Sequence, residues 1–235
     1  IDFNIKKYLD NKKSLETLIK HEYEQLTFID SDMDEIRNPK FTQEYYNHLK
    51  ELYQKVESSS FETSDISLSF KKEMFKVLYN KPPKIRSSHY INQSIDHDKI
   101  QKNYLENTPE LVVIDNFLQK EQLSELQKYC RNANIFKYPY QMGYVAAFLS
   151  KGMSSEFFLN LSEDLRKTFN LIFKDYQLTQ AWIFKYENNR EGTKIHADQA
   201  SINVNFWITP DEANLSKESG GLVIWNKLPP SNWSF

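Results

Sequence analysis

The sequence predicts an α+β protein, in which a helical first part is followed by a part rich in β-strands. All five glycines lie between residues 143 and 221, and residues 1–142 contain none. Because glycine is common in tight turns, this asymmetry favours a turn-rich second half. The spacing of apolar residues also changes along the chain, from a helical period near 3.6 to the strand period of two.

Composition excludes several classes of protein. The chain has 235 residues, 40% of them hydrophobic and 14% aromatic, which is enough for an extensive core. No run of 18 apolar residues predicts a membrane span. The net charge of −2 does not point to nucleic acid. The single Cys130 excludes a disulfide framework and a cysteine-based zinc module, and we expect it to be a packed thiol.

Apolar stripes predict short helices in residues 1–80. The stripes cover residues 15–26, 41–56 and 74–78, and Asn38-Pro39 is a good start for the second. Paired prolines in 81–88 predict a connector, because proline ends helices and favours extended backbone. We therefore divide the chain into a helical region, 1–80, a linker, 81–95, and a second domain, 96–235.

The second domain is predicted to contain helices over 96–106, 118–132 and 154–175. A β-branched run predicts a buried strand at 110–115. A period of two then predicts strands over 178–186, 201–208 and 221–225, separated by polar loops.

A loop between two of these predicted strands carries His196-Ala-Asp198. Residues i and i+2 of extended backbone point the same way, so the imidazole and the carboxylate can reach one metal ion. A surface histidine near a surface aspartate explains this spacing equally well. The flanking strands strengthen the metal hypothesis, because one face of each carries amides or aromatic rings that suit the wall of a polar pocket; ordinary core packing is the alternative. These side chains are Trp182, Phe184, Tyr186, Asn203, Asn205 and Trp207.

Several segments together carry a family resemblance: residues 112–118, Tyr186, His196-Ala-Asp198, residues 200–214 and residues 218–225. They resemble the iron(II)- and 2-oxoglutarate-dependent oxygenases, in particular the prolyl-hydroxylase-like oxygenases often found beside tetratricopeptide repeats. The resemblance covers about 90–235 and implies a double-stranded β-helix (jelly roll) core with flanking helices, here preceded by the helical N-terminal region.

The resemblance also implies the chemistry. His196 and Asp198 would be iron ligands, and Fe(II), 2-oxoglutarate and O₂ would be the cofactor and cosubstrates, with no catalytic residue beyond the metal ligands. Tyr186, ten residues before His196, would bind the distal carboxylate of 2-oxoglutarate. Asn205 and Trp207 match the inward face of the next strand. Because Asp198 keeps the carboxylate that iron halogenases lack, the resemblance implies hydroxylation rather than halogenation.

The sequence also departs from this family. A second iron histidine and an Arg or Lys that binds 2-oxoglutarate are expected some tens of residues after Gly220-Gly221, whereas the sequence stops at Phe235. We therefore expect a C-terminally incomplete oxygenase domain that binds iron weakly. The other histidines precede the core, match no motif and are expected to be structural or on the surface; they are His21, His48, His89 and His97.

The expected function is hydroxylation of a peptide or protein side chain, or of a small metabolite. The helices of 1–80 are a candidate surface for a protein partner, and no nucleic-acid or membrane partner is expected. A non-catalytic binding module with a degenerate β-helix domain is the alternative, and another metal-dependent enzyme on a cupin-like barrel is the third hypothesis. Iron use, a lone cysteine and the lack of an export signal favour the cytoplasm.

Overall fold

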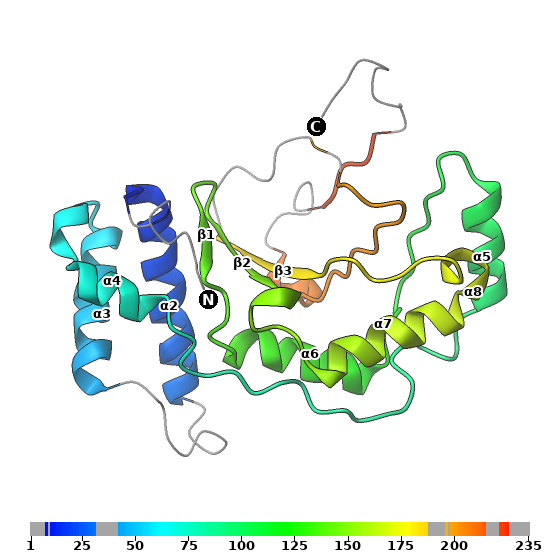
Figure 1. Cartoon of the computed structure of the whole chain (residues 1–235), viewed down its shortest axis with the longest axis horizontal. Helices are drawn as coiled ribbons and strands as arrows, with labels where there is room; N and C mark the ends of the chain where they lie inside the picture. Colours follow the sequence, from blue (N-terminus) through cyan, green and yellow to red (C-terminus); the bar gives the residue numbers. More distant parts are fainter. Residues whose placement is uncertain are drawn as a thin grey trace.

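The computed structural model describes residues 8, 10–31, 42–187, 196, 198–214 and 221–225. Within these residues the chain is a mixed α+β structure with a three-stranded antiparallel sheet. One group of helices stands at one side of the sheet, and a second group runs beneath it and beyond (Figure 1). The described part of the chain shows no jelly-roll core.

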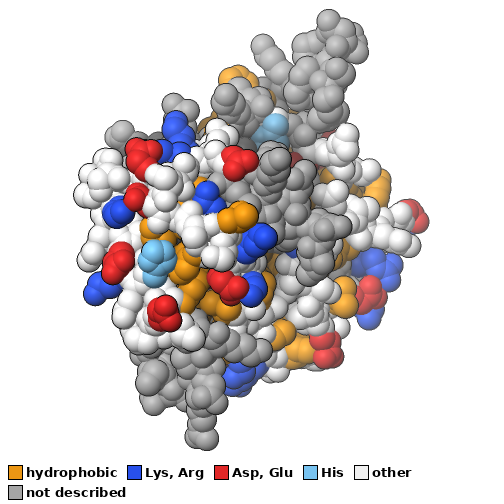
Figure 2. Space-filling model, turned by 60° about the vertical axis from the view of Figure 1, so that its left-hand side comes forward, with side chains coloured by type: hydrophobic (Ala, Val, Ile, Leu, Met, Phe, Trp, Pro, Cys, Tyr) orange, Lys and Arg blue, Asp and Glu red, His pale blue; other side chains and the backbone are white. Residues whose placement is uncertain are grey.

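The N-terminal helices are α2 (Lys12–Ser31), α3 (Gln43–Glu57) and α4 (Leu68–Met74). The first two apolar stripes are confirmed, whereas α4 ends where the third predicted stripe begins. The cap of α3 is Thr42, whose hydroxyl accepts the Tyr45 backbone N–H at 3.1 Å, rather than Asn38-Pro39, which lies outside the described residues. On the face seen in Figure 2, acidic and basic side chains are mixed.

The helices predicted in the second part of the chain are largely confirmed. They are α5 (His97–Glu106), α6 (Lys120–Asn132), α7 (Glu156–Thr168) and α8 (Asn170–Phe173). The single helix predicted over 154–175 is wrong in one respect, because Phe169 interrupts it with φ −111° and ψ 51°. Short 3₁₀ turns complete the helical elements at Thr63–Asp65, Leu149–Lys151 and Asp211–Ala213.

The sheet consists of β1 (Tyr138–Tyr140), β2 (Tyr144–Phe148) and β3 (Trp182–Tyr186), in that order. The hairpin of β1 and β2 was not predicted, although aromatic residues on both sides of Gly143 were a signal for it. Gly143 has φ 80°, a conformation that suits glycine in the turn. The strand predicted over 178–186 is confirmed only for its second half.

Three other strand predictions are wrong. Residues 110–115, 201–208 and 221–225 are described, and none of them belongs to a strand. Val113, expected to be buried, is 88% exposed. A strand requires a neighbour that pairs with its backbone, and β1–β3 pair only with one another in the described part of the chain. The apolar, β-branched composition of these segments favours extended backbone, but a strand forms only where another segment pairs with it.

The exposure of residues 110–115 gives a direct test. Val113→Lys is expected to change the free energy of unfolding by no more than about 0.5 kcal/mol, because the side chain already meets water. The matched control is Val145→Lys in β2, where the valine is buried; it should cost about 3 kcal/mol or more. Urea denaturation measures both changes, and an equal loss in the two variants would show that residues 110–115 are buried after all.

Two hydrophobic clusters make up the core of the described part of the chain. One is formed by α2, α3 and α4 with residues such as Leu18, Leu49 and Met74. The other lies between the sheet and α6 and α7, and it includes Val145 and Phe157. Helix α2 joins them, because it also packs against β1, β2 and α6.

A buried polar cluster crosses the boundary between the two clusters. Glu22 of α2 forms an ion pair with Lys137, 2.6 Å from Oε2 to Nζ, and the two side chains are 0% and 3% exposed. The Asn134 amide donates to the same carboxylate at 2.6 Å, and Lys137 also donates to the Met74 carbonyl at 2.9 Å. The cluster fixes the N-terminal helices against the sheet, because every one of these bonds joins the two parts of the chain.

None of the helices in the described part of the chain is long and apolar enough to cross a membrane.

Candidate functional site

One face of the sheet is aromatic. Side chains alternate along each strand, and the register places Tyr140 opposite Tyr144 and Tyr144 opposite Tyr186. The Tyr140 and Tyr144 rings stack at 4.4 Å, and the Tyr144 and Tyr186 rings are 5.1 Å apart. The rings that share this face are Tyr138, Tyr140, Tyr144, Phe148, Trp182, Phe184 and Tyr186.

The other face of the sheet packs onto the helices. Val145, Ala147 and Ile183 belong to the hydrophobic cluster, and Lys185 reaches the Cys130 carbonyl of α6 at 3.3 Å. The sequence therefore predicted correctly that Trp182, Phe184 and Tyr186 share a face, but it missed the rings of β1 and β2. Their signal was the spacing of two in Tyr-Pro-Tyr, residues 138–140.

The structure places His196 and Asp198 next to each other. The Nε2 atom of His196 lies 3.7 Å from Oδ1 of Asp198, with the side chains 56% and 35% exposed. Two donors that each bind one cation at about 2.1 Å cannot be more than about 4.2 Å apart, so this pair can share an ion. Imidazole nitrogen and carboxylate oxygen are also the donor types of non-heme iron sites.

Asn205 and Trp207 are less enclosed than predicted. The alternation of this segment is present only over residues 205–208: Phe206 and Ile208 pack on the sheet cluster and Asn205 and Trp207 are exposed, but Val204 is exposed as well. The Phe206 ring is 5.7 Å from that of Phe117, and Gln127 Nε2 donates to the Ile208 carbonyl at 2.7 Å. These contacts hold the segment on the body of the protein, but its amide-bearing face meets solvent.

A complete metal centre is not present among the described residues. They contain no group of three or more His, Cys, Asp or Glu side chains able to hold an ion. His196 and Asp198 are thus two donors of a possible site. Cys130, buried on α6, is a packed thiol as predicted, and burial raises its pKa to about 12. A thiol with so high a pKa is a poor nucleophile at neutral pH.

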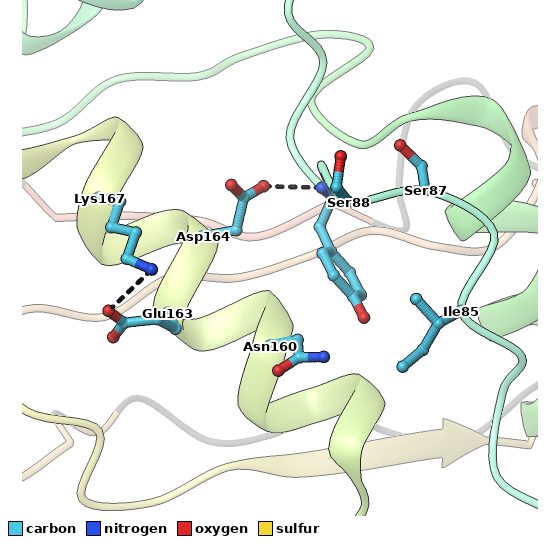
Figure 3. Close-up of a pocket in the computed structure, with 8 residues that line it drawn as sticks. Ile85, Ser87, Ser88, Asn160, Glu163, Asp164 and Lys167 are labelled. Carbon is cyan, nitrogen blue, oxygen red and sulfur yellow. Dashed lines mark hydrogen bonds and ion pairs between the residues drawn. The ribbon is translucent and has the colours of Figure 1, made fainter.

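A separate hollow of about 170 Å³ lies between residues 85–90 and α7 (Figure 3). Asp164 organises its wall by accepting the backbone N–H groups of Tyr90 and Ile91 at 2.7 and 2.9 Å. Lys167 and Glu163 form an ion pair at its rim, 3.4 Å apart. None of the lining residues belongs to the predicted iron or cosubstrate set, and its charges are already paired, so the hollow is a weaker candidate than the His196–Asp198 pair.

Comparisons of this chain with protein-family models, with curated proteins and with solved structures give no match. The support for the candidate site therefore comes from the residues of this chain alone.

Proposed function

We propose that this protein is an iron(II)- and 2-oxoglutarate-dependent hydroxylase. The observation that carries the proposal is the adjacency of His196 and Asp198, 3.7 Å apart, in the chain that leaves the aromatic strand β3. Iron bound with 2-oxoglutarate supplies oxygen activation, in which conversion of 2-oxoglutarate to succinate and CO₂ accompanies hydroxylation of a C–H bond. The substrate class is a peptide or protein side chain, or a small metabolite.

The chain's own residues have distinct parts in this proposal. His196 and Asp198 would hold the metal, and the carboxylate would offset one of its two positive charges. Tyr186 would donate its hydroxyl to the distal carboxylate of 2-oxoglutarate from the end of β3. The aromatic rings beside it would restrict water around the reacting atoms, which suppresses side reactions.

The experiment is an iron-binding and succinate-release assay on the full-length gene product, with and without Fe(II). His196→Ala and Asp198→Ala are each expected to reduce iron-dependent succinate release to background and to lower iron affinity at least about 100-fold. Tyr186→Phe should chiefly raise the KM for 2-oxoglutarate, since a lost hydrogen bond to a charged group costs about 1–2 kcal/mol. His48→Ala, on the surface of α3, is the matched control and should change neither measurement.

A binding module is the second candidate, favoured by the exposure of the donor pair and by the lack of a third ligand among the described residues. It predicts that the wild-type protein releases no succinate and that iron does not bind. Normal turnover by Asp198→Ala would instead show that the metal-ligand assignment is wrong.

A further inference from the structure

Helix α2 presents a buried imidazole to the sheet. His21 is only 8% exposed, and its ring meets the ring of Phe136 edge-on with the centroids 5.4 Å apart. The Nε2 atom is buried and has no hydrogen-bond partner among the described residues. Phe136 is itself fully buried, and its ring also lies 5.1 Å from the ammonium of Lys185.

The charges around this imidazole are mostly positive. Lys185 comes from β3, donates to Gln25 Oε1 at 2.7 Å and is held beneath α2. Lys137 precedes β1 and is paired with Glu22, whose carboxylate also takes the Asn134 amide. Other titratable groups act on these charges: Glu24 of α2 and Cys130 and Arg131 of α6 act on Lys185, Glu187 acts on Glu24, and the Tyr45 hydroxyl of α3 donates to Glu22.

We propose that α2 stays on the sheet only while the His21 side chain is uncharged, and that protonation of His21 releases this contact while α7 and its core remain folded. A protonated His21 would add a further buried cation to the charges of Lys185 and Lys137, and the buried carboxylate of Glu22 is already paired with Lys137. Leaving such a charge without a partner is far more costly than leaving a neutral imidazole. Opening the α2 contact would give the imidazolium access to water.

The direction of the pH effect follows from the burial of His21. Burial first, and then the charges of Lys185 and Lys137, lower the pKa of His21 well below its ordinary value of 6.5. As the pH falls, the open state therefore binds a proton at a higher pH than the closed state does. The closed contact keeps its full stability above about pH 6.5 and loses it as the pH falls, by up to about tenfold in the equilibrium constant for each pH unit.

Cys130 provides the probe, because it is the single cysteine and lies buried on α6, which packs against α2. Gln25 of α2 donates to the Arg131 carbonyl, next to this thiol. The experiment measures the rate at which 4,4′-dithiodipyridine modifies Cys130 in wild type, in His21→Phe and in His21→Gln. The ratio of wild-type to variant rates at one pH removes the intrinsic pH dependence of the thiol reaction.

At pH 7.5 we expect similar, slow modification in all three proteins. At pH 5.5 the wild type should react about tenfold faster than His21→Phe or His21→Gln, and hydrogen exchange should show α2 opening while α7 keeps its protection. His48→Gln, a substitution of the α3 histidine, should behave as wild type. A ratio near one at pH 5.5 would overturn the proposal, as would loss of protection in α7 at the same pH, which would mean global acid unfolding. The glutamine variant keeps the test valid if phenylalanine does not fit.

Discussion

Lys137→Met is expected to lower the free energy of unfolding by about 3–5 kcal/mol, one of the largest effects of any single substitution in this chain. The Glu22 carboxylate is fully buried, and Lys137 is its cationic partner at 2.6 Å. Among the described residues, the carboxylate would then keep the Asn134 amide and a longer contact of 3.4 Å from the Tyr45 hydroxyl. Methionine fills nearly the same volume, so the loss reports the unpaired charge rather than a cavity.

Urea denaturation at pH 7.5 measures this effect, and two further variants make the result specific. Lys12→Met breaks an exposed pair with Glu62 of similar length, 2.8 Å, and should leave the unfolding midpoint nearly unchanged. Glu22→Leu combined with Lys137→Met removes both buried charges and should recover much of the stability. A loss below about 1 kcal/mol in Lys137→Met would show that water reaches Glu22.

The helices could be predicted from the sequence because their signals are local. The stripe from Leu15 to Leu26 indicates which side of α2 is buried, and both residues are fully buried in the structure. Asp96 likewise marks the start of α5, where its carboxylate accepts the Lys99 backbone N–H at 3.0 Å. Such contacts span three or four residues, which is the range over which a sequence pattern is informative.

The strands and the junction of the two cores depend on contacts that are distant along the chain. Whether residues 110–115 form a strand depends on a pairing neighbour that the local sequence does not contain. The pairing of Glu22 with Lys137 joins residues 115 positions apart, and neither residue type is expected inside a core. The sequence therefore predicted His21 only as a structural or surface residue and gave no sign of its two lysine neighbours.

The candidate site also combines a local feature, which the sequence predicts, with features that depend on distant contacts. His196 and Asp198 were predicted as a pair from their spacing of two, and the structure places the two side chains together. The wider aromatic face could not be assembled, because Tyr140, Tyr144 and Tyr186 meet only through the register of three strands. The metal and the cosubstrate remain proposals that the assay on Asp198→Ala tests.

Phe157→Ala is expected to destabilise the protein by about 3–5 kcal/mol, because it removes a large ring from the centre of the sheet cluster. Phe157 is 2% exposed, and its ring packs edge-on against Tyr90 at 5.0 Å and against Phe158 at 5.5 Å. Leu159 lies two residues along the same helix and is 53% exposed. Leu159→Ala is therefore the matched control and should cost less than about 1 kcal/mol.

The position of Phe157 makes the same variant a test of how the two hydrophobic clusters are coupled. Phe157 belongs to the sheet cluster, whereas α3 contributes Leu49 and Leu52 to the other. If the buried Glu22–Lys137 pair and the packing of α2 make unfolding cooperative, hydrogen exchange at pH 7.5 should show α3 and α7 losing the same free energy of protection in Phe157→Ala. Unchanged protection of α3 would show instead that the helical region folds independently, as a separate domain. We expect equal losses at this pH, because His21 is then neutral and α2, whose Glu22 is paired with Lys137, stays on the sheet.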